Sequence, residues 1–281
     1  MLQLTPDSRD WPPEFQHIDA RPERLWLRGR IELLGQRPRV AIVGSRAPTP
    51  YGEAQARRFA RTLASAGVVI VSGLARGIDA AAHAGALDVG GATLAVLGCG
   101  VDRPWPPGEL ADRVSNEGLL LSEFHPGVGP RKHHFPLRNR LISALAEAVV
   151  VIEAAHASGS LITAHWAADQ GRKVYALPGR VDHPMARGCH RLIREGAELV
   201  ESPAEVLREV GFPQLAFDAP SNHPRDPIEA TLIGETLTTD ELAVRLGLTA
   251  SALLPRLTEL ELQERLVRAP GGLWRLSEGG S

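Results

Sequence analysis

The sequence predicts an α/β protein: an extended, Rossmann-like, doubly wound and mostly parallel sheet, followed by a small C-terminal winged-helix domain. Short apolar runs rich in Val and Ile recur from residue 40 to residue 177, and Gly or Ser and then a helical pattern follow them. The runs are continuous rather than alternating, which is typical of strands buried on both faces of a parallel sheet. Their alternation with helical patterns indicates βαβ units.

Residues 1–34 precede this pattern. They hold a proline-rich start and one short apolar stretch, Leu25-Trp26-Leu27, and are too few to fold alone. We expect an arm that packs on the Rossmann-like domain, residues 35–212. Within that domain, strands are expected at residues 40–43, 68–71, 93–97, 149–152 and 174–177. Helices are expected at residues 52–66, 78–89 and 160–170.

The periodic pattern stops at residues 213–226, which are rich in proline and are expected to form a linker. A compact pattern follows in residues 227–281. It ends in two short apolar runs, residues 266–268 and 273–276, that flank a Pro-Gly-Gly turn. Helices followed by such a β-ribbon are typical of a winged helix-turn-helix.

Two helices of this module have start and stop signals. Polar residues 238–240 can cap a helix over residues 241–246, and Gly247 ends it. A second helix is expected over residues 253–260. Pro255 should then lie in the first turn, because a proline deeper in a helix removes a backbone hydrogen bond.

The composition is that of an ordinary globular protein. The chain has 281 residues, of which 43% are hydrophobic, and a formal net charge of −2. This charge excludes a protein coated in positive charge, but not one whose Lys and Arg gather on one face. Cys99 and Cys189 lack metal-ligand spacing, so neither zinc nor another cofactor is expected. No apolar run reaches the ~18 residues of a membrane span, and we expect a cytoplasmic protein with no membrane contact.

Polar clusters that contain glycine follow three of the expected strands. Ligands of an open α/β sheet bind at the carboxyl ends of its strands, near the point where strand order reverses. Gly44-Ser45-Arg46 joins a tight turn to hydroxyl and guanidinium donors, and Ser72-Gly73 opens a helix whose N–H groups favour an anion. Residues 158–160 form the third cluster. A tight turn explains each one alone, but three together favour a phosphate-binding surface.

The strongest single feature is a basic stretch, residues 130–140, that contains no acid. A solvated basic loop is the plain interpretation, but a phenyl ring outside an apolar pattern is costly to leave in water. Basic side chains beside an aromatic platform are typical of proteins that hold single strands, whereas duplex readers place a helix in a groove. The candidate contacts in this stretch are Lys132, Phe135, Arg138, Asn139 and Arg140.

No catalytic constellation stands out. There is no G-x-S-x-G turn, acid pair, P-loop or metal-ligand set. His83 lies in an Ala-rich helix and is interpreted as a packed, hydrogen-bonded histidine. Glu153 ends a strand, where it fits a general base or a partner for nearby N–H groups. The sequence predicts a binding protein, not an enzyme.

At these clusters the sequence resembles the DNA-processing protein A family, also called DprA or Smf. The resemblance runs from about Trp11 to Val200, and many motifs in order make it specific. The C-terminal module resembles the winged helix that many members carry. The matching segments are Gly44-Ser45-Arg46, residues 72–79 with His83, and residues 122–124, 135–140, 158–164, 171–172, 178–179 and 188–197.

The resemblance implies non-sequence-specific binding and protection of single-stranded DNA, dimerisation, and loading of the RecA recombinase onto incoming strands in natural transformation. Family residues that match Arg46, Lys132 and Phe135 line the strand-binding pocket. The sequence departs from the family in two places. A helical N-terminal domain of many members is absent from this sequence, through truncation or lineage, and the usual Tyr-Pro stretch is replaced by residues 105–109, which leaves the role of that loop open.

The expected mechanism divides the contacts by chemistry. Phosphates are held by basic side chains, a base stacks on Phe135, and backbone N–H groups at Gly44-Ser45 and Ser72-Gly73 add neutral contacts. An arginine between strands equally fits a role in pinning a loop to the sheet. The basic side chains expected at phosphates are Arg46, Lys132, Arg138 and Arg140.

Two other functions compete with this one. The nucleotide phosphoribohydrolases are a related Rossmann-like group of enzymes, but their Pro-Gly-Gly-x-Gly-Thr-x-x-Glu stretch is replaced here by residues 158–163, with no Glu at that spacing. A transcription regulator would read duplex DNA through the winged helix. Between residues 250 and 264, however, that helix has Arg256 against three glutamates. Such a helix favours a packing or protein-contact role.

Overall fold

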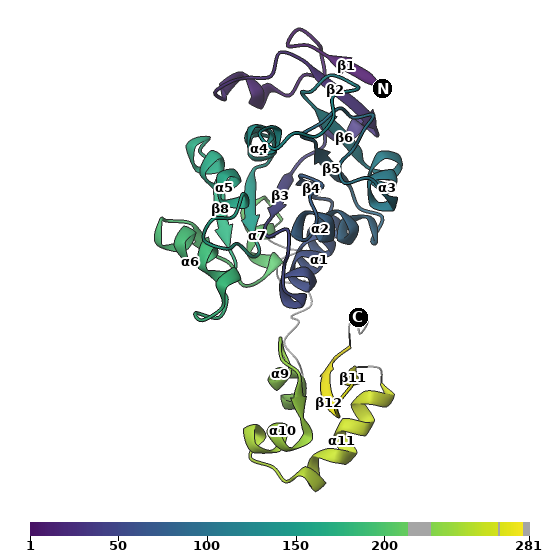
Figure 1. Cartoon of the computed structure of the whole chain (residues 1–281), viewed down its shortest axis with the longest axis vertical. Helices are drawn as coiled ribbons and strands as arrows, with labels where there is room; N and C mark the ends of the chain where they lie inside the picture. Colours follow the sequence, from purple (N-terminus) through teal and green to yellow (C-terminus); the bar gives the residue numbers. More distant parts are fainter. Residues whose placement is uncertain (213–225, 264, 278–281) are drawn as a thin grey trace. The chain divides into compact units, whose positions relative to one another are not determined.

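The computed structural model describes residues 1–212, 226–263 and 265–277. The chain divides into two compact units, residues 1–219 and 220–281 (Figure 1), called the N-terminal and C-terminal units below. The expected linker, residues 213–226, lies outside the described residues except for Asp226. In the described parts of the chain, no helix is long and apolar enough to cross a membrane.

A nine-stranded sheet forms the centre of the N-terminal unit, in the order β1-β2-β6-β5-β4-β3-β7-β8-β9. The strands from β6 to β9 in this order are parallel, and β1 and β2 join antiparallel at one side. The predicted doubly wound, mostly parallel sheet is confirmed. The strands are β1 (Leu2–Leu4), β2 (Leu25–Gly29), β3 (Arg39–Val43), β4 (Val69–Ser72), β5 (Thr93–Val96), β6 (Leu119–Ser122), β7 (Ala148–Val151), β8 (Lys173–Ala176) and β9 (Glu198–Leu199).

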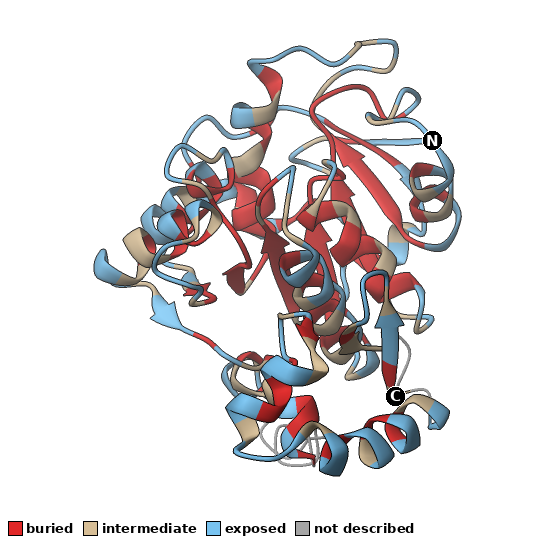
Figure 2. Ribbon diagram, turned by 60° about the horizontal axis from the view of Figure 1, so that its bottom comes forward, coloured by how far each residue is buried: buried red, intermediate tan, exposed pale blue. Residues whose placement is uncertain are grey.

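Helices cover both faces of this sheet (Figure 1). Side chains of β3 alternate between the two layers: Val43 packs in the cluster of α4, α5 and α6, and Ile42 in that of α1, α2 and α7. The central strands, from β3 to β7 in the chain, are buried between helices whose outer faces are exposed (Figure 2). The helices are α1 (Pro50–Ser65), α2 (Ile78–Leu87), α3 (Glu109–Glu117), α4 (His134–Leu145), α5 (Ser160–Asp169), α6 (Arg187–Arg194) and α7 (Pro203–Glu209).

The N-terminal residues contribute directly to this core. Strand β2 pairs with β6, and the side chains of Phe15, Leu25 and Leu27 are fully buried in the cluster beneath α4. A 3-10 helix, η1 (Pro13–His17), lies between β1 and β2, a second, η2 (Ile31–Leu34), lies between β2 and β3, and a third, η3 (Pro184–Ala186), precedes α6.

Helix α4 is the main departure from the sequence-based expectation, because the basic stretch was not assigned a helix. Residues from His134 onward form α4, and its inner face carries Leu141, Ile142 and Leu145. Pro136 lies in the first turn, where a missing N–H breaks no helical hydrogen bond. Basic and apolar residues are mixed at the start of this helix, so its periodicity is weak in the sequence.

The C-terminal unit has the predicted winged-helix order. Its small core gathers Leu242, Leu257 and Trp274 between the helices and a three-stranded sheet of order β10-β12-β11. Its elements are α9 (Pro227–Thr231), β10 (Leu237–Thr238), α10 (Thr239–Leu246), α11 (Ala250–Leu262), β11 (Leu266–Ala269) and β12 (Leu273–Leu276).

The expected position of Pro255 is wrong. Helix α11 starts at Ala250, because the Thr249 hydroxyl accepts a hydrogen bond from the Ala252 N–H and caps the helix at that point. Pro255 therefore lies inside the helix and not in its first turn. The polar residues before Leu253 look like a loop in the sequence, which hid this early start.

Candidate nucleic-acid interface

The loops that follow the parallel strands all emerge at one edge of the sheet, called the carboxyl edge below. It comprises residues 44–49 after β3, 73–77 after β4, 97–108 after β5, 123–133 after β6 and 152–159 after β7. The chain winds from β3 to β6 on one side and from β7 to β9 on the other, so strand order reverses between β3 and β7. This reversal is the usual ligand position in an open α/β sheet.

The loop after β3 is fixed by Glu153 of the loop after β7. The Ser45 N–H donates to the Glu153 carbonyl oxygen at 2.7 Å. The Glu153 carboxylate accepts from the Thr49 N–H at 2.9 Å and from the Thr49 hydroxyl at 2.6 Å. A Cβ at Gly44 would lie 2.7 Å from Cγ1 of Ile78, so only glycine allows this close approach. Glu153 thus acts as the partner of N–H and hydroxyl donors, one of its two sequence-based interpretations.

The loop after β4 uses its own N–H groups. The N–H groups of Gly73 and Ala75 donate to Oδ2 of Asp79 at 3.1 and 3.4 Å. The hydroxyl of the buried Ser72 donates to the Ile42 carbonyl at 2.6 Å. Burial raises the pKa of the Asp79 carboxyl, and the nearby Arg138 guanidinium and these N–H donors oppose the shift. Asp79 therefore occupies the place at which the sequence predicted a bound anion.

His83 completes this loop as a neutral histidine. Burial lowers its pKa to about 3, so Nε2 accepts from the Leu74 N–H at 3.3 Å. Nδ1 then carries the proton and donates to the Thr93 hydroxyl at 2.7 Å. Leu74 is buried with φ +56°, a left-handed conformation that non-glycine residues rarely adopt. The predicted packed histidine thus holds an unusual backbone turn.

Arg138 of α4 lies beneath the carboxyl edge. It is 3% exposed, and its Nη1 donates to the Gly73 carbonyl at 2.7 Å and to the Val96 carbonyl. A Cβ at Gly73 would lie 2.5 Å from Nη2, so glycine makes room for the guanidinium. Burial lowers the pKa of Arg138 to about 10, and Asp79 opposes this shift. Arg138 remains charged at neutral pH and ties α4 to the ends of β4 and β5.

Arg140 and Asn139 also have protein partners. Arg140 is buried and pairs with both carboxylate oxygens of Glu123 at 2.7 and 2.6 Å, and it donates to the Ala20 carbonyl. The Asn139 amide donates to the Gly159 carbonyl at 3.2 Å. The inward face of α4 therefore directs Arg138 and Arg140 away from solvent, which argues against the phosphate contacts expected of them and favours the pinning role.

The other predicted cations remain open to solvent. Arg46 and Lys132 are exposed, and among the described residues neither has a carboxylate within ion-pair distance. The Arg46 guanidinium lies over the half-buried ring of Phe135, 5.3 Å from its centroid. The structure thus brings together two of the predicted contacts, one from the loop after β3 and one from the first turn of α4. Two exposed cations at this edge, Arg76 and Arg131, lie within the predicted clusters but were not selected from the sequence.

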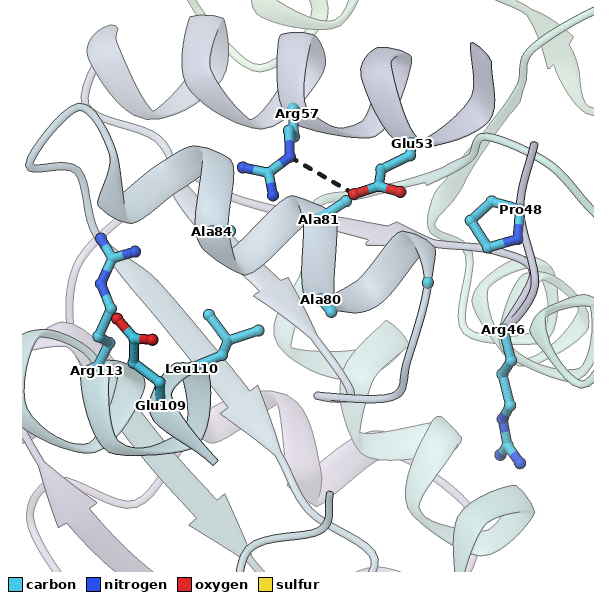
Figure 3. Close-up of a pocket in the computed structure, with 11 residues that line it drawn as sticks. Arg46, Pro48, Glu53, Arg57, Ala80, Ala81, Ala84, Glu109, Leu110 and Arg113 are labelled. Atoms are coloured by element: carbon cyan, nitrogen blue, oxygen red, sulfur yellow. Dashed lines mark ion pairs between the residues drawn. The ribbon is translucent and has the colours of Figure 1, made fainter. Parts of the chain in front are cut away.

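A hollow of about 470 Å³ adjoins this surface between α1, α2 and α3 (Figure 3). Two of the arginines that line it are already paired: Arg57 and Arg113 lie 3.2 and 3.3 Å from the two carboxylate oxygens of Asp88. Glu53 also faces Arg57, at 3.9 Å. The side chain of Arg46 points away from the α2 wall of the hollow in Figure 3. Arg46 also lines the hollow, but the rest of its charged lining mixes arginines with Glu53 and Glu109 and does not continue the open cationic surface.

Among the described residues, three arginines of the C-terminal unit, unlike Arg46 and Lys132, form ion pairs with acidic side chains. Arg245 pairs with Glu235 at 2.8 Å, Arg256 with Asp226 at 2.8 Å, and Arg265 with Glu229. These three arginines therefore already have acidic partners within the small domain.

Comparison with known proteins shows which sequence families this chain matches. A family model described as DNA recombination-mediator protein A matches residues 3–211, and one described as DprA winged helix domain matches residues 216–272. The protein Smf of Escherichia coli is 40% identical over 96% of this chain and 76% of its own length. The DNA processing protein DprA of Streptococcus pneumoniae is 45% identical over 72% of each chain.

Two solved structures are similar in fold and sequence. DNA processing protein A from Streptococcus pneumoniae superposes with a TM-score of 0.71 at 43% identity, over 75% of each chain. DNA processing protein A from Helicobacter pylori gives a TM-score of 0.67 at 31% identity, over 74% of this chain and 94% of its own. The latter structure is described as giving insight into a unique mode of single-stranded DNA binding.

Proposed function

The chain belongs to the DNA recombination-mediator protein A family, and from this premise we propose that it binds single-stranded DNA without sequence specificity. The relative from Helicobacter pylori is described by its mode of single-stranded DNA binding, which supports the proposal. The function follows from the residues at the carboxyl edge of the sheet.

One observation carries the proposal: Arg46 lies over Phe135, Lys132 precedes Phe135 by three positions, and no described carboxylate lies within ion-pair distance of either cation. Cations that track phosphates and a ring that stacks on a base are the two parts used to hold single strands. A phosphate can bind Arg46 without breaking an ion pair, since among the described residues no carboxylate lies within ion-pair distance of its guanidinium. A base can then add to the exposed part of the Phe135 ring.

The ring of Phe135 is held in place from below. A Cβ at Gly98 would lie 2.9 Å from Cδ1 of the ring, so the missing side chain lets the ring lie on the backbone of the loop after β5. His134 fixes the same turn, because its Nδ1 lies 3.1 Å from the Gly98 carbonyl oxygen. Such prior ordering lowers the conformational entropy lost when a base stacks.

The remaining predicted contacts take positioning roles in this proposal. The Ser45 and Gly73 N–H groups already have protein acceptors, and Gly44 allows close approach of Ile78. Ser72 holds β4 to β3 through its hydroxyl. Three residues of α4 anchor that helix through their protein partners: Arg138, Asn139 and Arg140.

Single strands fit this surface better than duplex DNA does. Duplex readers insert a helix or ribbon into a groove. The N-terminal residues of α4 instead lie against the ends of β4 and β5, where Arg138 holds them. A base can reach Phe135 only if it is free of its partner, so we expect a preference for unpaired DNA.

The test is a gel-shift series with oligo-dT of increasing length and with a duplex of matched length. We expect binding to oligo-dT above a minimum length, weak binding to duplex, and loss of affinity as salt rises. Equal affinity for blunt duplex and oligo-dT would contradict the proposal. So would binding that ignores salt concentration.

The resemblance extends the proposal to partners. We propose that the protein acts in the cytoplasm as a homodimer, protects incoming strands in natural transformation and loads the RecA recombinase onto them. Two strand sites in one dimer would raise avidity on a long strand, because the second contact becomes intramolecular. Sedimentation of the chain alone tests the dimer, and RecA filament formation on oligo-dT with and without the protein tests the loading.

A further inference from the structure

We propose that Trp105 is a second stacking platform for a base of the same single strand. The inference rests on the function proposed above and assigns a role to the loop after β5, residues 97–108. The first observation is that the indole of Trp105 is exposed to solvent. Trp105 is 47% exposed, whereas Trp11, Trp26 and Trp274 are all less than 9% exposed.

Exposure alone does not make a binding site, because single apolar side chains are common on protein surfaces. The second observation is that the loop carrying Trp105 has a fixed backbone. Hydrogen bonds join it to the next loop of the carboxyl edge, residues 123–133. The Gly100 N–H donates to the Val128 carbonyl at 2.8 Å. The Asp102 carboxylate accepts from the Gly127 N–H at 2.8 and 2.9 Å.

Side chains of the loop itself and of the adjacent strand β6 hold it further. The Cys99 thiol donates to the Arg103 carbonyl at 3.1 Å, and the Ser122 hydroxyl donates to the Cys99 carbonyl at 2.7 Å. An ordered loop therefore holds a large aromatic ring in solvent. Ordering before binding lowers the entropy lost when a ligand stacks on the ring.

The same loop also carries the first platform. It passes through Gly98, on which the ring of Phe135 lies, and the Gly98 carbonyl is bonded to His134. Trp105 follows seven positions later on this closed loop. The loop emerges from β5, beside β4, so both rings belong to the carboxyl edge that also presents Arg46.

The charges near Trp105 indicate what kind of contact it makes. Arg103 is exposed and faces Asp102 at 4.0 Å, so the loop is not uniformly positive. A strand that reaches this loop would gain from the indole more than from new phosphate contacts. We therefore expect Trp105 to contribute affinity that does not depend on salt.

The experiment uses the full chain with three substitutions: Trp105→Ala, Trp105→Phe, and Trp166→Phe as the control on the half-buried tryptophan of α5. Affinity for oligo-dT is measured at several salt concentrations, together with tryptophan fluorescence. We expect Trp105→Ala to weaken binding roughly 5- to 150-fold, the range typical of one stacked base, with an unchanged salt slope. The Trp105→Phe variant should recover part of this loss.

Fluorescence and abasic DNA separate stacking from a structural role. Oligo-dT should quench the fluorescence of the wild-type protein and of the Trp166→Phe variant, and the quenching should disappear in Trp105→Phe. The wild-type preference for oligo-dT over an abasic strand of equal length should shrink in Trp105→Ala. If that variant does not fold, as judged by circular dichroism, Trp105→Phe still reports the quenching.

The outcomes distinguish this inference from the function beneath it. If both Trp105 variants bind like the wild-type protein and the quenching persists in Trp105→Phe, Trp105 is no platform, while Phe135→Ala still reports on the strand site. If the wild-type protein does not bind oligo-dT at all, the proposed function itself fails.

Discussion

The carboxyl edge and the winged helix both present a cation beside an aromatic ring, but they use the pair differently. At the edge, Arg46 lies 5.3 Å from the centroid of a half-buried Phe135. In the winged helix, Arg268 lies 4.9 Å from the centroid of Trp274, which is 1% exposed and donates its Nε1–H to the Thr239 hydroxyl. The first ring is open to a base, and the second is part of a core.

The cations of the two regions also differ in whether an acidic side chain pairs with them. In the winged helix, three arginines are held by acids, and Arg256 shares Asp226 and Glu259. At the carboxyl edge, Arg46 and Lys132 have no such partner among the described residues. A phosphate that takes an acid-paired arginine must replace an existing contact, whereas an unpaired cation is available. The winged-helix architecture is used by many DNA readers, but availability of its side chains, and not its fold, decides whether it binds.

The comparison between the carboxyl edge and the winged helix is tested most strongly by removing the two exposed cations Arg46 and Lys132. We expect the double substitution Arg46→Ala with Lys132→Ala to weaken binding to oligo-dT by roughly 100-fold at low salt. The salt slope should fall by about 1.4, or about 0.7 for each phosphate that the variant no longer neutralises. Affinity measured by fluorescence anisotropy at several salt concentrations gives both numbers.

A matched control removes the same charge elsewhere. Arg61 is exposed on α1, roughly 16 Å along the helix from Pro50 at 1.5 Å per residue, and Lys173 pairs with Glu198 and Glu209 at the start of β8. The double substitution Arg61→Ala with Lys173→Ala should leave the salt slope nearly unchanged. An equal loss in both double variants would mean that net charge, and not this surface, determines binding.

Arg138 should give an effect of similar size, but in stability and not in binding. Arg138→Met leaves Asp79 buried without its cation and two carbonyls without a donor, so we expect a loss of unfolding free energy of order 3 kcal/mol. Urea denaturation measures it. Because Arg138 touches no phosphate in the proposal, the salt slope of the binding that remains should equal that of the wild-type protein. A lower slope would restore the sequence-based expectation of a phosphate contact.

Phe135 tests the aromatic half of the comparison. Replacing it with Ala should cost about 1–3 kcal/mol of binding free energy, the usual value of one stacked base, with the salt slope unchanged. Phe135→Leu keeps an apolar side chain over Gly98 but offers no ring, so it should lose nearly as much. Full affinity in Phe135→Leu would show that packing on Gly98 matters and stacking does not.

The sequence predicted five of the nine described strands of the sheet, β3, β4, β5, β7 and β8, and the order of elements in the C-terminal unit, because continuous Val-rich runs and helix caps are local signals. It did not predict β1, β2, β6 or β9. It selected Arg46 and Phe135, which the structure brings together. It did not separate Lys132 from Arg138 and Arg140, because a basic stretch does not reveal which side of a helix faces the sheet. The partners of the buried arginines, Gly73 and Glu123, are distant in sequence, so only the fold shows them.

His83 should make the stability of the folded state depend on pH. Its pKa is about 3 in the folded chain and about 6.5 when exposed, so below pH 6.5 the unfolded chain binds a proton that the folded chain does not. The folded state should lose stability as pH falls from 6.5 toward 3, by at most about 1.4 kcal/mol per pH unit from this group. His83→Gln keeps an acceptor for Leu74 but does not titrate.

Urea denaturation between pH 7 and pH 4.5 measures this slope. The wild-type protein should lose stability more steeply than His83→Gln, whereas the exposed His156→Gln should follow the wild-type protein. Identical slopes in wild-type protein and His83→Gln would mean that His83 is not held neutral in the fold.

The smallest effect is expected from the winged helix, and it tests the comparison from the other side. A chain that ends at residue 219 lacks the C-terminal unit but keeps the whole carboxyl edge. We expect its affinity for oligo-dT to stay within about twofold of the full chain, because each described acid-paired arginine of the lost unit already has a partner. Duplex binding should remain equally weak in both. A tenfold loss on oligo-dT, or measurable duplex binding that disappears with the truncation, would show that the winged helix contributes directly to DNA binding, with the wing residue Arg268 as the first candidate because its only described partner is the ring of Trp274.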